Sequence, residues 1–258
     1  MYLRAVHAET SIAALRQLIR SNPLGVLTTA IPSKRFPTIL SSHIPWILDV
    51  EDESSETELG TLRGHLARAN PQSKTMIDSL EGASRPSGSF LEEEVLVLFT
   101  ADVHHYITPK FYTETKPESG KVVPTWNYAA AQAYGKAKIY FDSKSLESGA
   151  FLSQQIHDLS QHAEASMMGY DGKEGRQGAW KVADAPEKYI ELLQKAIIGI
   201  EVKLDRLEGK FKMSQESTYG DREGVIKGFE ALGSEIGDKM ARTVKERSNL
   251  KDAGRQSS

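Results

Sequence analysis

The stretch Val122–Gly135, VVPTWNYAAAQAYG, is the segment around which this chain is organised. Pro124 fixes its own φ, removes a backbone donor and pushes Val123 toward extended geometry. From Thr125 to Tyr128, hydrogen-bonding side chains alternate with two flat aromatic rings. Such a cluster either holds a planar ligand or fixes a loop to the core. Its composition alone favours the second interpretation.

The composition is that of a soluble globular protein, because 39% of the 258 residues are hydrophobic and 26% are charged. The net charge of -3, from 32 basic and 35 acidic residues, gives no broad basic field for DNA or anionic lipid. The absence of cysteine excludes disulfides and thiolate nucleophiles. The N-terminal sequence lacks an apolar signal core, and no run approaches the length of a membrane span. We therefore expect a cytoplasmic protein without a membrane partner, and the nucleus stays open.

Short apolar segments bounded by turn residues predict about seven strands. They lie at residues 25–30, 38–48, 61–67, 95–99, 133–141, 200–204 and 210–215, and the segment 103–108 either continues the strand at 95–99 or pairs with it. Pro45 within the second segment indicates a sheet edge or a bulge. Glu208–Gly209 is interpreted as a turn, which makes the last two segments a hairpin. Asn70–Pro71 is interpreted as a turn as well.

Apolar residues at helical spacing predict helices, most of them late in the chain. These cover residues 10–21, 142–168, 186–199 and 221–233, and loops are predicted at 49–58, 79–94 and 114–120. The fold class is therefore mainly β with added helices (α+β), an antiparallel sheet closed toward a barrel with helices outside. We expect one domain over residues 1–233, with peripheral helices at about 142–168 and 186–199. Residues 234–258 are expected to form a helical or disordered tail.

The segment GHLARANP presents an imidazole, a guanidinium and an amide at the end of a predicted strand, from His65, Arg68 and Asn70. A guanidinium is a two-pronged donor that suits phosphate or carboxylate. In the alternative interpretation this is a structural turn, with Asn70 bonded to its own backbone and Arg68 solvated. Composition alone favours that alternative.

The segment KFKMSQ alternates polar and apolar residues, so a strand would direct Lys210, Lys212 and Ser214 to one face. Phe211 and Met213 would then occupy the other face. Two ammonium groups and a hydroxyl could hold a phosphate without a glycine-rich loop. A solvated strand face is the simpler interpretation of the same pattern.

Metal and nucleophilic chemistry are not predicted. The adjacent His104 and His105 would point to opposite faces of a strand, and neither they nor His43 and His65 have carboxylates at ligand spacing. There is no GxSxG motif, and neighbours such as Ser42 and His43 on a strand do not form a triad. No catalytic residue is assigned.

Six blocks follow one another along the chain: Asn22–Gly25, Ser42–Pro45, Gly64–Gln72, His104–Tyr112, Val122–Tyr128 and Ile198–Gln215. In this order they resemble the PaiB family of FMN-binding split-barrel proteins, over about residues 1–233. The chain departs from the family pattern in insertions near 50–58 and 79–94, in the tail, at Ser73 and at Lys110.

The resemblance implies a six-stranded split barrel that forms a homodimer, with a flavin site at the subunit interface. FMN needs a cationic, hydroxyl-bearing patch for its phosphate and a flat wall with donors for its ring. The phosphate candidates are His65, Arg68, Lys212 and Ser214, and the ring candidates are Thr125, Trp126, Asn127 and Tyr128. His43 and Asn70, in the matching blocks, complete the expected cofactor-binding set.

The expected function is flavin (FMN) binding, with FMN-dependent oxidoreductase activity as one form of it. A second hypothesis is a cofactor-free regulatory or interaction protein of the negative transcriptional regulator type. Direct DNA binding is not expected, because the chain lacks a helix-turn-helix signature and a basic face. A third hypothesis is a haem-binding split barrel, in which His43, His65 or His104 would be the axial ligand.

Overall fold

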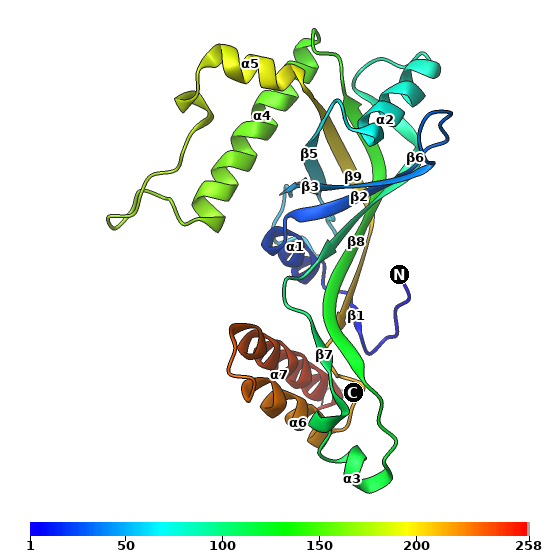
Figure 1. The fold of residues 1–258 in the computed structure, drawn as a ribbon, viewed down its shortest axis with the longest axis vertical. Helices are drawn as coiled ribbons and strands as arrows, with labels where there is room; N and C mark the ends of the chain where they lie inside the picture. The colour runs from blue at the N-terminus through cyan, green and yellow to red at the C-terminus, as the bar shows by residue number, and fades with distance from the viewer. Residues whose placement is uncertain (257–258) are drawn as a thin grey trace. The chain divides into compact units, whose positions relative to one another are not determined.

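The computed structural model describes residues 1–256, with side chains described up to Ala253. It is an antiparallel sheet with added helices, which confirms the predicted α+β class (Figure 1). The strands are β1 (Ala8–Glu9), β2 (Leu24–Ala30), β3 (Ile39–Pro45), β4 (Ile47–Asp49), β5 (Thr61–Ala67), β6 (Ser89–Thr100), β7 (His105–Ile107), β8 (Thr125–Tyr140) and β9 (Ile197–Lys212).

The structure also contains the following helices and helical turns, given in chain order. They are α1 (Ile12–Ser21), α2 (Pro71–Gly82), the 3-10 turn η1 (Pro109–Phe111), α3 (Thr115–Ser119), α4 (Leu146–His162), the π-helical turn η2 (Ala163–Met167), the 3-10 turn η3 (Val182–Asp184), α5 (Glu187–Lys195), α6 (Tyr219–Glu230) and α7 (Glu235–Gln256).

The chain forms two compact units, each built from separate segments. Unit 1 contains residues 1–22, 100–132 and 208 onward, and unit 2 contains residues 23–99 and 133–207. Strands β8 and β9 therefore contribute residues to both units, and so does β6 through its last residue, Thr100. A single domain over residues 1–233 stays a prediction, and residues 257–258 of the predicted tail lie outside the described residues.

The sheet has the strand order β3-β2-β6-β8-β9-β5-β4, with β1 added to β9 and β7 added to β8. In the described part of the chain this path is open, with β3 and β4 at its ends. The edge position of β3 agrees with the edge that Pro45 indicated, and the strand breaks at Trp46 before β4. Buried apolar side chains of these strands form the core of unit 2: Leu27, Ile44, Leu62, Val97, Phe99 and Val202.

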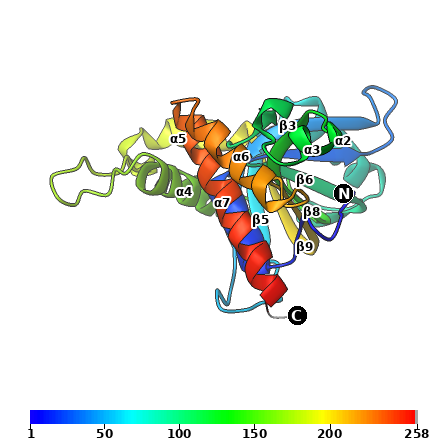
Figure 2. The ribbon, with the colours of Figure 1, turned by 90° about the horizontal axis from the view of Figure 1, so that it is seen from below.

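Helices α4 and α5 of unit 2 lie side by side in the structure (Figure 1). The side chain of Gln194 on α5 donates from Nε2 to Ser153 Oγ on α4 at 3.1 Å. Within unit 1, α6 and α7 form a second helical pair (Figures 1 and 2). This pair is joined by Arg222, which is 2% exposed and contacts Ser248 and Asp252 on α7.

The predicted hairpin at Glu208–Gly209 is wrong, because β9 runs through these residues without a turn. Gly209 pairs with Glu9 of β1, and a Cβ added to Gly209 would lie 1.9 Å from Leu15 Cδ2. The glycine therefore makes room for α1 and does not reverse the chain. Strand β8 is likewise longer than predicted, since it begins at Thr125 and includes the aromatic cluster.

The predicted loop at 79–94 is wrong at both ends. Helix α2 continues to Gly82, and β6 begins at Ser89. The predicted turn at Asn70–Pro71 is the start of α2: Asn70 Oδ1 accepts from the Gln72 amide at 2.8 Å, and the proline occupies the first helical turn. An N-cap residue followed by proline is a helix-start signal, so the residues themselves carried this information.

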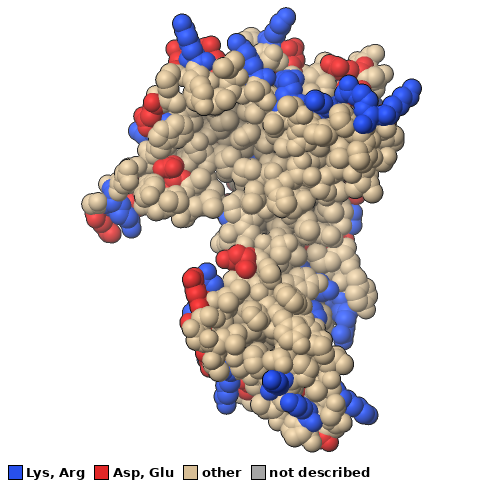
Figure 3. Space-filling model, in the orientation of Figure 1, with Lys and Arg blue, Asp and Glu red and all other residues tan. Residues whose placement is uncertain are grey.

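Figure 3 shows Lys and Arg interspersed with Asp and Glu over the face in view. Over residues 1–256, none of the helices combines the length and the apolar character that crossing a bilayer requires.

Candidate functional site

Unit 1 presents a surface of aromatic rings along β8. Strand alternation turns Asn127 inward, where it is 0% exposed, and leaves Trp126 48% exposed with Tyr128 half-buried on the outer side. Tyr106 of β7 pairs with Trp126, and their ring centroids lie 6.3 Å apart in an edge-to-face arrangement. His104 lies beside the same indole, with 6.1 Å between centroids. These four residues, Tyr106, Trp126, Tyr128 and His104, are called the outer aromatic surface below.

Ser214 and Asn127 lie beneath this surface. Asn127 Nδ2 donates to Ser214 Oγ at 3.0 Å, and Ser214 is 2% exposed. Strand β9 ends at Lys212, and Ser214 has a φ of 63°, so the alternation expected across KFKMSQ stops before the serine. The serine consequently turns inward, away from the side on which the two lysines lie. Its hydroxyl fixes the end of β9 to β8.

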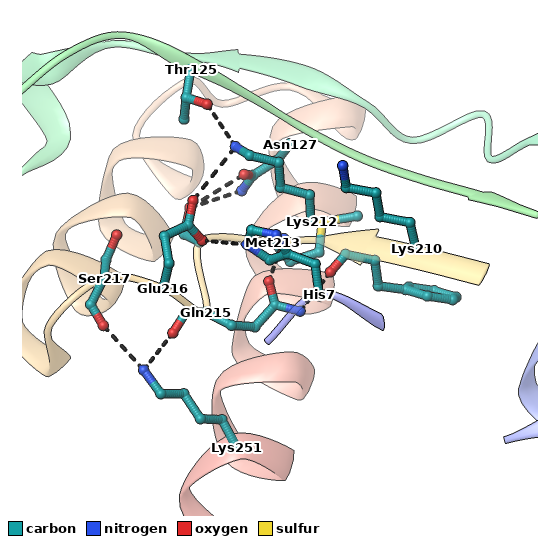
Figure 4. A network of polar contacts seen from close by, with 12 residues as sticks. His7, Thr125, Asn127, Lys210, Lys212, Met213, Gln215, Glu216, Ser217 and Lys251 are labelled. Atoms are coloured by element: carbon teal, nitrogen blue, oxygen red, sulfur yellow. Dashed lines mark hydrogen bonds and ion pairs between the residues drawn. The ribbon is translucent and has the colours of Figure 1, made fainter. Parts of the chain in front are cut away.

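Lys212 is at the centre of a polar network (Figure 4). Its Nζ donates to Thr125 Oγ1 at 2.6 Å and to the Trp126 carbonyl at 3.0 Å, and lies 3.6 Å from Glu216 Oε1. The other carboxylate oxygen of Glu216 lies 2.9 Å from Nε2 of His7, a side chain that is 2% exposed. The network thus places a carboxylate between a lysine and a buried histidine.

The Glu216 carboxylate is held in its ionised form. Burial raises its pKa, but the hydrogen bond with His7 and the charge of Lys212 outweigh burial and leave the pKa below its ordinary value. A depressed pKa in the folded state contributes stability above the unfolded pKa, and this contribution is lost as the pH falls through the folded value.

We therefore expect wild type to exceed Glu216→Gln in stability at pH 7, with the gap closing as the pH falls below about 4.5, the ordinary value for this carboxyl. Urea unfolding of both proteins at pH 7, 5, 4 and 3 measures the gap. A difference that stays constant across this range would contradict the assignment of Glu216 as an ionised member of the network.

The loop that follows β9 is held in place by its own side chains and by α7. Gln215 accepts from the Met213 amide and donates to the Phe211 carbonyl, both at 2.6 Å. Lys251 of α7 donates to the carbonyls of Gln215 and Ser217. These contacts fix the backbone on both sides of Glu216 and therefore fix the carboxylate beside Lys212.

The remaining predicted site residues lie in unit 2. His43 is exposed on β3. His65, on β5, is half-buried, and its Nδ1 has no hydrogen-bond partner within the described part of the chain. Burial lowers the pKa of the His65 imidazole, so the neutral form predominates near pH 7. An unpartnered nitrogen on a neutral imidazole has the capacity for one further hydrogen bond, as donor or acceptor according to its tautomer.

Arg68 and Asn70 have structural partners. The Arg68 guanidinium donates to the carbonyls of Phe141 at 2.6 Å, Lys195 at 3.2 Å and Ile197 at 3.3 Å, so the arginine is not left to solvent. Asn70 caps α2, as the alternative interpretation of local backbone bonding predicted, and its Nδ2 donates to Ser42 Oγ at 3.1 Å. Ligand contact by Arg68 and Asn70 stays a prediction.

Arg68→Ala should lower the free energy of unfolding by about 2 kcal/mol, because the three carbonyls to which the guanidinium donates would lose that hydrogen bond. Chemical denaturation measures the change. Arg35→Ala is the matched control: its partner is Asp78, both side chains are more than half exposed, and the expected loss is below about 0.5 kcal/mol. Equal losses in the two variants would show that Arg68 has no special structural role.

Sequence reasoning included neither His7 nor Glu216 in the site. His7 belongs to a segment with no recognised motif, and Glu216 follows a bend that the strand pattern does not reveal. Lys210 was placed correctly beside Lys212 on one face of the strand, but it was not selected as a cofactor contact. Glu216 pairs with Lys212 and not with Lys210, and only the three-dimensional structure shows this difference between the two lysines.

Residues 1–206 match the model of a family described as "Putative FMN-binding domain". An uncharacterized protein of Aspergillus fumigatus is 58% identical over 260 residues, covering 98% of this chain and 99% of its own. Protease synthase and sporulation protein PAI 2 of Bacillus subtilis is 24% identical, over 88% of this chain and 87% of its own. The solved FAD and heme binding protein of Mycobacterium smegmatis has a TM-score of 0.45 at 13% identity, covering 80% of this chain and 73% of its own.

Proposed function

Because this chain belongs to the FMN-binding domain family whose model covers residues 1–206, we propose that it binds FMN and that unit 1 provides a flavin contact surface. The observation that carries the proposal is the outer aromatic surface, which places exposed rings beside lysines at the end of β9. A planar ligand with a phosphate needs both of these features.

The residues of unit 1 fit the two parts of the ligand. Trp126 and Tyr128 offer flat faces on the same side of β8, suited to stacking against an isoalloxazine ring. Lys212 lies beside them and is tied to Thr125 and to the Trp126 backbone. We assign Asn127 and Ser214 the role of holding β8 and the end of β9 in position, because both are buried and bonded to each other.

We retain the predicted residues of unit 2 as proposed cofactor contacts. His65 has the strongest support, since its Nδ1 is the unpartnered buried nitrogen described above. His43 is supported by its exposure on β3. Arg68 and Asn70 remain in the set because their blocks match the family pattern.

A bound flavin would supply hydride or single-electron transfer, so oxidoreductase activity belongs to this proposal. The contribution of the chain is to bind and orient the ring through Trp126 and Tyr128. A cytoplasmic location completes the proposal, and cell fractionation would test it.

The absorbance spectrum of the purified protein, followed by titration with FMN, tests the proposal. Flavin bands in the purified protein, or saturable quenching of FMN fluorescence, are the expected results. A Soret band would favour the haem hypothesis. A colourless protein that takes up neither ligand would contradict flavin binding and favour the regulatory hypothesis.

Trp126→Ala should weaken FMN binding about tenfold, since stacking on an aromatic side chain contributes about 1–3 kcal/mol per ring by alanine substitution of base-stacking residues. Fluorescence titration measures the dissociation constant. Trp180→Ala is the matched control, because Trp180 is exposed to a similar degree, 46% against 48%, and lies in unit 2, outside the outer aromatic surface. Equal effects of the two substitutions would contradict a ring contact at Trp126.

We also propose that the protein is a homodimer, as the family resemblance implies. Light scattering at low micromolar concentration should give about twice the chain mass of 28.5 kDa. A monomer with full FMN affinity would contradict a flavin site that needs both subunits.

A further inference from the structure

Three ionisable residues follow one another on the same side of β9, at two-residue spacing: Glu208, Lys210 and Lys212. Their charge environments differ. The Met1 amino nitrogen lies 2.6 Å from Glu208 Oε2, so this carboxylate has a cationic partner. Lys212 has Glu216 as its carboxylate partner. Lys210 lies between these two ion pairs.

The charge of Lys212 is already balanced. Its Nζ is surrounded by the Glu216 carboxylate, Thr125 Oγ1 and the Trp126 carbonyl, and the side chain is only 17% exposed. An anionic ligand at this ammonium would have to displace Glu216 or bind beside a negative charge. The depressed pKa of Glu216 keeps that carboxylate negative.

The ammonium of Lys210 has a different set of neighbours. Among the described residues no carboxylate lies within ion-pair distance of it, and its one hydrogen bond is a long one of 3.4 Å to the Tyr2 carbonyl. Its Nζ lies 5.5 Å from the ring centroid of Tyr128 and 5.9 Å from that of Tyr2. Figure 4 shows the Lys210 side chain next to Lys212, with no dashed line from its nitrogen.

We infer that Lys210 is the residue that recognises the phosphate of the ligand, and that the Lys212–Glu216 pair holds the neighbouring strand end in position. This inference rests on the proposed function and names the residue that distinguishes FMN from riboflavin. A cation without a carboxylate partner, next to the Tyr128 ring, gains a full charge interaction from an incoming phosphate. The interaction of a phosphate with Lys212 is weaker, because the Glu216 carboxylate already pairs with that ammonium.

The consequence is a specific pattern of affinities. Lys210→Ala should weaken FMN binding about tenfold, the effect of losing one charge-assisted contact of about 1.4 kcal/mol, and should change riboflavin binding less than about twofold. Glu216→Gln should strengthen FMN binding about threefold without changing riboflavin binding, because it releases the charge of Lys212. A purely structural role for either residue would move both ligands together.

Fluorescence titration of the full chain with FMN and with riboflavin, at pH 8 where the phosphate is dianionic, tests the inference. Wild type, Lys210→Ala, Lys210→Arg and Glu216→Gln are compared, with Lys203→Ala as the control because Lys203 is an exposed lysine earlier in β9, in unit 2. Lys210→Arg keeps the charge and should retain the preference for FMN.

The inference is supported if Lys210→Ala loses the preference for FMN over riboflavin and the other variants keep it. An unchanged ratio of FMN to riboflavin affinity in that variant, with wild type still binding FMN, overturns the inference and leaves the proposed function in place. A wild-type protein that binds neither ligand overturns both. Circular dichroism of each variant confirms that differences in affinity do not arise from unfolding.

Discussion

Gly135→Ala is expected to destabilise the protein by about 3 kcal/mol, at the upper end of the range for overpacking. Gly135 lies within β8, and a Cβ added there would sit 2.1 Å from the backbone carbonyl oxygen of Lys203 on β9. The obstacle is backbone, so rotation of a side chain cannot relieve it. The two strands must separate locally, which disrupts the pairing at the centre of the sheet.

Urea unfolding followed by circular dichroism measures this loss. Gly149→Ala is the matched control: it makes the same substitution on helix α4, where nothing lies within 4 Å of the added Cβ. The control should gain about 0.5–1 kcal/mol, because alanine restricts the unfolded chain and favours helix. A Gly135→Ala protein as stable as wild type would mean that β8 and β9 do not approach each other so closely in solution.

Asp252→Ala should cost about 2–3 kcal/mol through its effect on Arg222, toward the lower end for breaking a buried ion pair because the aspartate is partly exposed. The Arg222 guanidinium is 2% exposed and bonds both oxygens of Asp252, at 2.7 and 2.6 Å. Removing the carboxylate leaves a buried cation whose remaining hydrogen bonds go to Ser248 and the Ser217 carbonyl, with the Tyr219 ring 5.6 Å away.

A second substitution separates this effect from simple loss of packing. Arg222→Met combined with Asp252→Ala should recover most of the stability, because an apolar side chain of similar length needs no counter-charge. Glu94→Ala is the control, since Glu94 pairs with Arg206 at an exposed position and should cost less than about 1 kcal/mol. Additive losses from Arg222→Met and Asp252→Ala, in a double-mutant cycle of unfolding free energies, would contradict the pairing as the cause.

Much of the sheet was predictable because local patterns were sufficient for its short strands. The apolar segment at residues 61–67, bounded by turn residues, predicted a strand with the bounds of β5. The long strands were not predictable in the same way. Gly209 carries a turn signal in sequence, but its actual cause is the approach of Leu15, a residue almost 200 positions away. Tertiary contact therefore overrode local turn propensity.

The site was predictable in its residue types and less so in its geometry. Trp126 and Tyr128 lie on one side of β8 because the strand begins at Thr125, whereas the predicted strand began only at residue 133. The inward turn of Ser214 depends on a left-handed backbone conformation that no residue type in KFKMSQ requires. The difference between Lys210 and Lys212 depends on Glu216, whose place beside Lys212 is fixed by contacts from α7.

Strands β8 and β9 have residues in both units, and this limits how either unit could pass from one gene to another. Unit 1 is assembled from three stretches of chain and unit 2 from two, and three of the four crossings between units, at 99–100, 132–133 and 207–208, fall inside strands. A single recombination event cannot transfer either unit intact to another gene. A gene truncated near codon 206 would lose the β9 residues that pair with β1, together with the helices that follow. Transfer of either unit to another gene would therefore need more than one exchange, with breakpoints inside shared strands.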